Sequence, residues 1–330
     1  MRIGKRVTYE ANRLVLKANY WLGRYQETIW LIGDGRSGTT WVSSLINWDH
    51  QLREMFEPFH PRAGREMQAF LPHHYLRPNE ENDTIYRLAK DVFSGHLTQR
   101  RVDAHNSGLV YRGLLVKDIF VNLAARWAVN RFPNVKIVLL VRNPFAAALS
   151  KHKKRHWLWV TDPKDLQAQP ALQEDYLHEF DDVINACSDD YIERQILIWS
   201  IIHHVPLRQF EAGKICVVFY EDIYASPMRA LSTIFQFVRG TDPTVDSETL
   251  QRIIATPSRV AGAKSNLAKG QSPVNSWQNE LSTQQIDRGY AILARFGLDT
   301  LYDANGMPQE GQVERLLARN SAPVRASSRA

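Results

Sequence analysis

Cysteine is scarce in this sequence, which has only Cys187 and Cys216 among its 330 residues. Two cysteines cannot form a disulfide framework, and there is no CxxC motif or cluster of cysteine and histidine that would indicate a zinc site. We therefore expect two reduced, small apolar side chains, as in a cytoplasmic protein, and no bound metal.

Long apolar runs are also missing. No stretch of 18 apolar residues occurs, so the sequence predicts no transmembrane helix. The basic N-terminus lacks the continuous apolar core and the small-residue cleavage site of a secretory signal. These absences predict a cytoplasmic protein, either free or associated with a membrane surface.

The charge balance is basic, with 41 Lys and Arg against 35 Asp and Glu, a formal net charge of +6. The excess lies at the two ends of the chain. Residues 1–25 hold six basic residues and one acidic residue, and residues 311–330 hold four Arg and one Glu. Because the central part is not basic, the charge gives little support to nucleic-acid binding, and we expect no nucleic-acid partner.

The chain divides into three parts. Residues 1–27 read as a basic amphipathic helix, which either packs on the outside of the protein or contacts an anionic membrane or a partner. Residues 28–300 form the main domain. Residues 301–330 read as a flexible C-terminal tail.

Short apolar strands alternate with helical segments through the main domain. Strands are expected at 28–32, 52–56, 114–116, 135–141 and 215–220; helices are expected at 39–47, 85–99, 120–131, 189–210, 228–238, 245–255 and 282–296, with another after Pro144. This alternation predicts an α/β fold: a P-loop-type, doubly wound, mostly parallel sheet flanked by helices in a single domain. Ligands of such sheets bind beyond the carboxyl ends of the strands.

A glycine-rich turn follows the first expected strand, in the sequence Gly33-Asp-Gly-Arg-Ser-Gly-Thr-Thr40. Glycines let the backbone N–H groups converge, and the start of the next helix adds its positive dipole, so a phosphate fits there. The two outer glycines have Walker A spacing, but Thr39 stands where a nucleotide triphosphatase needs Lys. The cation lies inside the loop, as Arg36, which argues against ATP or GTP hydrolysis.

A second candidate anion site follows the strand at 135–141. Arg142 leaves this strand in the sequence Arg-Asn-Pro-Phe, and Ser150 lies two turns into the next helix. A guanidinium group suits bidentate phosphate binding, and a hydroxyl adds a neutral donor. Two separate phosphate-binding places suggest a nucleotide with phosphates at both ends.

Together the two motifs resemble the sulfotransferase family, which uses 3′-phosphoadenosine-5′-phosphosulfate (PAPS). The run Arg36–Trp41 is similar to the family's 5′-phosphosulfate loop, and Arg142 with Ser150 resembles its 3′-phosphate motif. The resemblance spans about residues 28–300. An Arg in the loop is similar to the Golgi glycan and tyrosylprotein branches.

The resemblance implies the roles of the site residues. Backbone N–H groups of Ser37, Gly38, Thr39 and Thr40 would hold the 5′ end, while Arg142 and Ser150 would hold the 3′-phosphate. Arg36 would stabilise the charge that develops on the leaving group. The segment 55–60 resembles the Glu-Pro element of glycan sulfotransferases, and 116–118 resembles the Lys-Asp-Pro element, although Ile119 replaces the proline. Ser265, Lys269 and Gly270 resemble the loop that closes over the nucleotide.

The reaction that this resemblance implies needs a base for the acceptor hydroxyl and cations near the leaving oxygen. Glu57 is the expected base, and we expect partial burial to raise its pKa. Lys117 is expected to assist the leaving oxygen. The adjacent pairs His73-His74 and His203-His204 cannot each share one helix face, so we expect no metal site and structural roles for them.

The acceptor is left open by the sequence. The glycan-like elements favour a hydroxyl on a carbohydrate, in a glycan, polysaccharide or glycolipid. A protein tyrosine or a small alcohol is the alternative, and a nucleotide-binding protein without turnover is a further one. The basic run 151–156 reads as a solvated helix face or as an attractant for anions, and Trp159 as a core residue or a platform for a sugar ring.

Overall fold

The computed structural model describes residues 2–154, 159–256 and 274–320 of the chain, and the side chains from residue 9 onward. Its strands are β1 (Glu27–Gly33), β2 (Leu52–Phe56), β3 (Gly113–Asp118), β4 (Val135–Val141) and β5 (Cys216–Phe219). The helices of the first half are α1 (Arg2–Trp21), α2 (Thr39–Ile46), α3 (Asp83–Phe93), α4 (Ala125–Arg131) and α5 (Pro144–Lys153). Those of the second half are α6 (Lys164–Gln167), α7 (Pro170–Leu172), α8 (Asp181–Asn185), α9 (Tyr191–Gln209), α10 (Tyr220–Ala225), α11 (Pro227–Arg239), α12 (Ser247–Ala255), α13 (Thr283–Arg295) and α14 (Gln312–Arg319).

The strands form one five-stranded parallel sheet in the order β2-β3-β1-β4-β5. The register pairs Leu31 of β1 with Lys117 of β3, and Phe56 of β2 with the same Lys117. The polar residues that follow β1, β2 and β3 are therefore brought to one edge of the sheet. The expected doubly wound α/β fold is confirmed.

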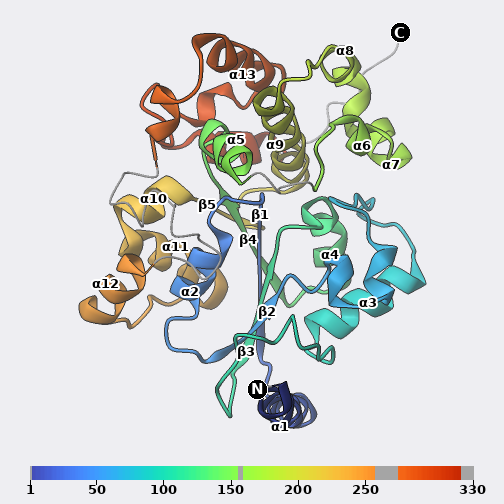
Figure 1. Ribbon diagram of the computed structural model, residues 1–330, viewed down its shortest axis with the longest axis vertical. Helices are drawn as coiled ribbons and strands as arrows, with labels where there is room; N and C mark the ends of the chain where they lie inside the picture. The colour runs from blue at the N-terminus through green and yellow to red at the C-terminus, as the bar shows by residue number, and fades with distance from the viewer. Residues whose placement is uncertain (1, 155–158, 257–273, 321–330) are drawn as a thin grey trace.

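Helices cover both faces of the sheet (Figure 1). One face packs against α2, α10, α11 and α12, and the other against α3, α4, α5, α9 and α13. Strands buried on both faces are nearly continuous apolar runs, which explains why β4 and β3 could be recognised from the sequence.

The expected helix at 85–99 is too long. Helix α3 ends at Phe93, and Gly95 follows in the left-handed region at φ 76°. A Cβ at Gly95 would lie 2.6 Å from the Tyr25 ring, so a glycine is required where the chain leaves the helix.

The predicted flexible tail is wrong for residues 301–320. Leu301, Val313 and Leu317 are buried, and the Asn320 amide donates to the carbonyl oxygens of Leu207 and Phe210 at the end of α9. These C-terminal apolar residues thus belong to the core. Residues 321–330 lie outside the described part of the chain.

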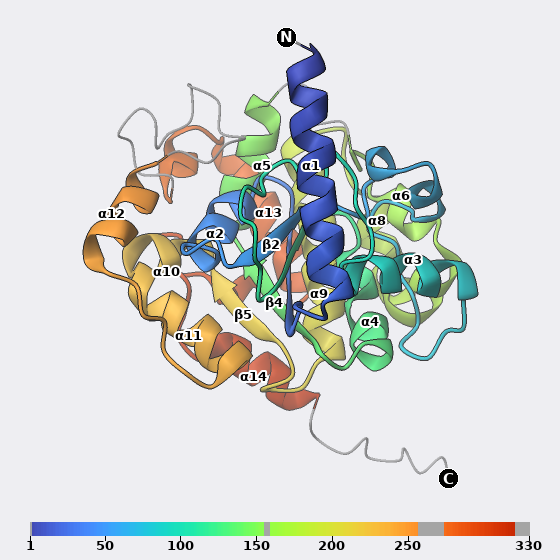
Figure 2. The same cartoon turned by 90° about the horizontal axis from the view of Figure 1, so that it is seen from below.

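The N-terminal helix α1 lies along the outside of the fold and leads into β1 (Figure 2). Within the described residues, no helix combines the length and the apolar content needed to span a bilayer.

Candidate functional site

The loop between β1 and α2 has two residues in left-handed conformations. Arg36 has φ 68° and Gly38 has φ 92°. A Cβ on Gly38 would lie 2.7 Å from ring atoms of Tyr220, so only glycine fits there. The backbone curl that was expected from the glycine spacing is present.

The start of α2 is open to an anion. No side chain caps this end, because the N-cap residue is Gly38. Thr39 and Thr40 begin the helix, where N–H groups have no helical carbonyl to bond. The Ser37 hydroxyl is buried without a hydrogen-bond partner among the described residues, although its backbone N–H donates to Asp34 O at 3.2 Å. A bound phosphate oxygen would satisfy these donors.

The two expected anion sites lie together. Arg36 Nε donates to Ser150 Oγ at 3.3 Å, and an Arg142 amino group donates to the carbonyl oxygen of Arg36 at 2.8 Å. Burial, and then the nearby Arg142 charge, lower the pKa of Arg36 from its usual value. Two guanidinium groups held this close indicate a place for an anion with more than one charge.

A buried ion pair joins the loop to α5. Lys151 Nζ lies 2.6 Å from Asp34 Oδ2, and both side chains are 2% exposed. The same ammonium group donates to Gln195 Oε1 on α9 at 2.9 Å. Neither expected reading of the basic run at 151–156 fits Lys151, which is neither solvated nor free to attract anions.

Glu57 lies directly after β2, with a left-handed backbone at φ 47°. Its Oε1 accepts from Lys117 Nζ at 2.8 Å, and its Oε2 accepts from Arg101. Burial raises the pKa of Glu57, but Lys117 and Arg101 outweigh burial and hold it below the usual value. The expected rise of this pKa is therefore wrong, and the carboxylate is ionised at neutral pH.

Lys117 is buried in β3 and lies 4.5 Å from the centroid of the Phe56 ring. The next residue, Asp118, is fully buried and accepts the backbone N–H groups of Phe120 and Val121. Burial is the main cause that raises the pKa of Asp118 to about 7. Asp118 thus shapes the turn after β3, while Lys117 faces Glu57.

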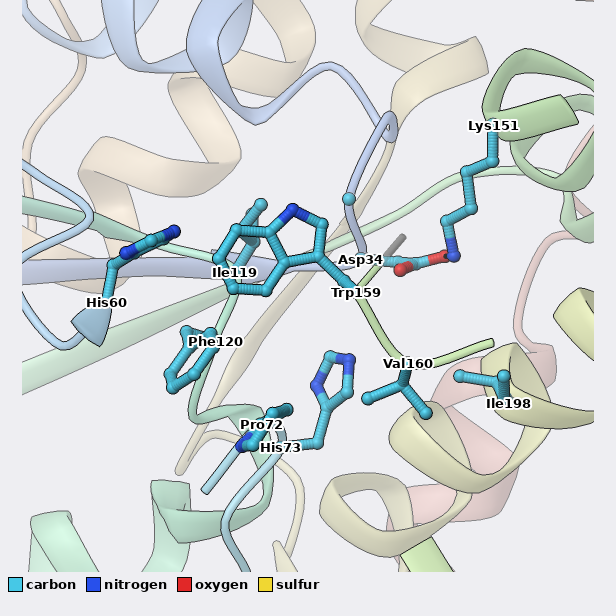
Figure 3. Close-up of a pocket in the computed structure, with 11 residues that line it drawn as sticks. Asp34, His60, Pro72, His73, Ile119, Phe120, Lys151, Trp159, Val160 and Ile198 are labelled. Carbon is cyan, nitrogen blue, oxygen red and sulfur yellow. Dashed lines mark ion pairs between the residues drawn. The ribbon is translucent and has the colours of Figure 1, made fainter. Parts of the chain in front are cut away.

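A pocket opens against the first two residues of the loop, Asp34 and Gly35, at the carboxyl ends of the strands (Figure 3). It is partly open to solvent. Its other lining residues are largely apolar: His60, Pro72, His73, Ile119, Phe120, Lys151, Trp159, Val160 and Ile198. The Trp159 ring lies against Phe120 and His60, with ring centroids 5.4 and 4.3 Å apart.

Two histidines of this pocket are neutral. Burial lowers the pKa of both His60 and His73 to about 4. The Nδ1 atom of His60 accepts the Arg62 N–H, so the proton of the neutral ring is on Nε2, which makes it a donor. His73 has a left-handed backbone at φ 49°, and its Nδ1 is buried without a partner among the described residues.

The structure does not describe three of the expected site residues. Ser265, Lys269 and Gly270, expected to close over the nucleotide, are outside the described residues. Among described residues, no group of three His, Cys, Asp or Glu side chains is placed to hold a metal ion.

Sequence reasoning missed Arg101 and the pairing of Asp34 with Lys151. Arg101 lies 44 residues from Glu57, in a segment without a motif. Asp34 did carry a signal, because an acidic side chain inside an anion-binding loop needs a buried cation to offset its charge.

The solved structures that the chain resembles include sulfotransferases. The sulfotransferase domain from the Synechococcus PCC 7002 olefin synthase is 15% identical with TM-score 0.44, over 81% of this chain and 94% of that one. The sulfotransferase domain from the curacin biosynthetic pathway is 18% identical with TM-score 0.45, over 82% and 98%. Mouse sulfotransferase SULT7A1 complexed with PAP is 14% identical with TM-score 0.43, over 93% and 92%.

No curated protein matches the chain. Residues 28–241, however, match the model of the Sulfotransferase family. This segment is well over half of the chain and contains the loop, Glu57, Lys117, Arg142 and Ser150. The family and the enzyme class expected from the sequence are confirmed: the chain belongs to the sulfotransferase family.

Proposed function

We propose that this protein transfers a sulfuryl group from PAPS to the hydroxyl group of an acceptor. The observation that carries the proposal is the hydrogen-bonded link between the loop and the second anion site, through Arg36, Ser150 and Arg142. Phosphate groups at both ends of one nucleotide would occupy these two adjoining places.

The donors present fit this nucleotide. The N–H groups that begin α2 are suited to the 5′ end, and so is the buried Ser37 hydroxyl, which has no partner in the described part of the chain. The guanidinium of Arg142 and the hydroxyl of Ser150 are suited to the 3′-phosphate, which distinguishes PAPS from nucleotides without it. When bound, PAPS supplies an activated sulfuryl group joined to the 5′-phosphate.

Arg36 and Lys117 are the cations that we assign to the charge of the leaving oxygen. Both are largely removed from water, where a fixed positive charge acts more strongly than in solvent. The ammonium group of Lys117 is paired with Oε1 of Glu57. This pairing fixes its orientation at the edge of the sheet.

Glu57 is the residue that we propose as the base. Its carboxylate is ionised at neutral pH and so can accept the proton of an acceptor hydroxyl. Lys117 and Arg101 reduce its proton affinity, but they also hold both oxygens in fixed positions. The two cations thus orient the Glu57 carboxylate but make it a weaker base.

A carbohydrate acceptor is the proposal that the sequence favours, through the Glu-Pro element at 57–58. The pocket supports a second candidate, a hydroxyl on an apolar body such as a phenol or an aliphatic alcohol. Asp34 and Lys151 are already paired with each other, and most other lining groups are apolar. The hydroxyls of a sugar ring would find few partners there, and unpaired polar groups are costly when buried.

Labelled PAPS offered with a panel of acceptors tests these proposals. We expect transfer to a hydroxyl acceptor, and Glu57→Ala should abolish it while binding of PAP, measured by calorimetry, stays unchanged. Glu57→Gln keeps the shape but removes the base and should be equally inactive. Near-wild-type turnover in either variant would reject Glu57 as the base, and PAP binding without transfer to any acceptor would indicate a binding protein.

The same panel decides between the acceptors. Glycans and monosaccharides form one arm, 2-naphthol and 1-octanol the second, and a tyrosine peptide the third. Val160→Phe, which narrows the pocket, should raise KM for the apolar alcohols alone. An unchanged KM would show that the acceptor does not enter this pocket.

A further inference from the structure

Helix α1 is fixed to the fold by one of its sides. Leu16 and Asn19 are buried, and the Asn19 amide donates to Leu109 O at 2.9 Å. The Asn12 amide donates to Asn106 O at 3.2 Å, and Tyr111 N donates to Asn19 Oδ1. This side of α1 therefore has its partners within the protein.

The opposite side of α1 has large apolar side chains that are exposed. Leu14 is 69% exposed and Trp21 is 78% exposed. They are seven residues apart, two helical turns, and lie on the side away from Leu16. Leu22, the residue after the helix end, is 67% exposed. A helix with one exposed side normally has polar residues there, and Glu10 and Lys17 are of this kind, but the large apolar side chains beside them are not.

The segment that α1 binds also has exposed apolar side chains. Leu109 is 75% exposed and Val110 is also exposed, next to the Asn19 hydrogen bonds that tie this segment to the helix. We call Leu14, Trp21 and Leu22 the α1 surface. Large apolar side chains that gather on one exposed side mark a binding surface more often than isolated ones do.

Cations accompany the α1 surface. Lys17, Arg24 and Arg112 are exposed, and none of them has an ion-pair partner among the described residues. The one acidic residue of the first 25, Glu10, is paired with Arg13 at 3.3 Å. The surface thus combines exposed Trp and Leu side chains with unpaired positive charge.

We propose that the α1 surface binds the face of an anionic phospholipid bilayer, with α1 lying on the membrane and Trp21 at the level of the headgroups. Apolar side chains gain from insertion, and lysines and arginines are attracted to acidic headgroups. A second copy of this chain fits less well, because a symmetric contact would place Lys17, Arg24 and Arg112 of both copies against one another.

The position of the α1 surface leaves the site open to solution. Trp21 and Leu22 precede β1, and Arg112 precedes β3, so the surface lies at the amino ends of these strands. The loop lies at the carboxyl ends of the strands, away from α1 (Figure 1). The pocket is lined by residues of this loop. Bilayer binding by α1 and access of soluble reactants to the site are therefore compatible.

Cosedimentation of the full chain with vesicles tests the proposal. We expect binding to vesicles of phosphatidylcholine mixed with phosphatidylserine, and much weaker binding to phosphatidylcholine alone. Removing two cations with Lys17→Gln and Arg24→Gln should weaken binding to the mixed vesicles about 30-fold. Trp21→Ala should weaken it about tenfold, since an inserted ring is lost.

Matched variants on other parts of the surface serve as controls. Lys90→Gln with Arg208→Gln removes two exposed cations of α3 and α9, and Met228→Ala removes an exposed apolar side chain of α11. These variants should bind vesicles as the unchanged chain does, and all of them should keep PAP affinity and thermal stability.

Equal binding to both kinds of vesicle, or an unchanged affinity of Trp21→Ala, would overturn the proposal. So would a dimer in analytical ultracentrifugation that Trp21→Ala converts to monomer, because a second copy would then cover the α1 surface.

Discussion

Three residues at the site adopt left-handed backbones although they are not glycines: Arg36, Glu57 and His73. Such conformations cost about 1–3 kcal/mol each and persist only where neighbours hold them. The Glu57 N–H donates to Lys117 O at 2.7 Å, and the His73 N–H donates to Phe120 O at 2.6 Å. Glu57 and His73 are thus held by the end of β3 and by the turn that follows it, which links their positions.

Gly38→Ala is expected to destabilise the protein by about 3 kcal/mol, because it adds a left-handed alanine and a contact with the Tyr220 ring. The ring cannot move easily, since it packs against Trp41 and lies under the Arg142 guanidinium. Urea unfolding gives the free energy of unfolding, and calorimetry should show weaker PAP binding.

Gly240→Ala is the matched control, because Gly240 has a similar φ of 69° but nothing within 4 Å of an added Cβ. Its cost should be about 1 kcal/mol, the conformational part alone. Equal losses in the two variants would show that the Tyr220 contact contributes nothing.

Arg101→Gln is expected to move the acid side of the kcat–pH profile to higher pH, because it removes one of the two cations that lower the pKa of Glu57. Activity that needs ionised Glu57 is lost as pH falls through this pKa, so a higher pKa means loss at higher pH. Arg101→Lys keeps the charge and should leave the profile nearly unchanged. If the acid side of the profile does not move in Arg101→Gln, a group other than Glu57 controls the loss of activity at low pH.

The loop and helix α5 act as one unit through the buried pair of Asp34 and Lys151. Asp34→Asn leaves an ammonium group buried without its counter-charge and should cost about 3–5 kcal/mol in urea unfolding. It should also raise KM for PAPS, because Ser150 precedes Lys151 on α5. The double variant with Lys151→Met should recover much of the stability. Additive losses would contradict direct coupling between the two side chains.

The elements that the sequence predicted well are those with a local signal. Strands β2 and β4 have the expected bounds. For β4 the signal is a nearly unbroken apolar run, as expected of a strand buried on both faces. The glycine spacing after β1 and the Arg142–Ser150 spacing likewise led to the expectation that these residues lie at one edge of the sheet, where the structure brings them together. The sequence also predicted that Glu57 directly follows a strand.

The remaining features depend on contacts between distant residues. The pKa of Glu57 was expected to rise because burial was foreseen and Arg101 was not. Lys151 was expected to be solvated because its neighbours in the run are basic, and only the fold brings Asp34 to it. The segment of helix α14 was expected to be a flexible tail because it has few apolar residues. Its buried residues Val313 and Leu317 pack near α9, which lies about 100 residues earlier in the chain.

At the scale of the whole molecule, the C-terminal helix closes the core beside α9. Deleting residues 312–330 should cost about 4 kcal/mol in urea unfolding, since Val313 and Leu317 lose their burial and Asn320 its two hydrogen bonds. Deleting residues 321–330 alone keeps every one of these contacts and should change little. If the two truncated proteins unfold at the same urea concentration, α14 does not contribute to the stability of the core.

The stability of the whole chain should fall as the pH drops from about 6.5 towards 4. Burial lowers the pKa of four histidines, His60, His73, His203 and His204, to about 4, so they bind protons in the unfolded chain before they bind them in the folded one. Burial raises the pKa of Asp118 and Glu221 to about 7, and these two carboxyls act in the opposite direction.

The four histidines outweigh the two carboxyls, so unfolding should take up about two protons near pH 5 and the free energy of unfolding should fall by about 2–3 kcal/mol per pH unit there. Urea unfolding at a series of pH values measures this slope. His203→Gln removes one titrating group and should reduce the slope, whereas His96→Gln changes a half-exposed histidine outside the core and should leave it unchanged. A stability that is constant between pH 7 and 5 would show that these buried histidines accept protons as readily in the folded chain as in the unfolded one.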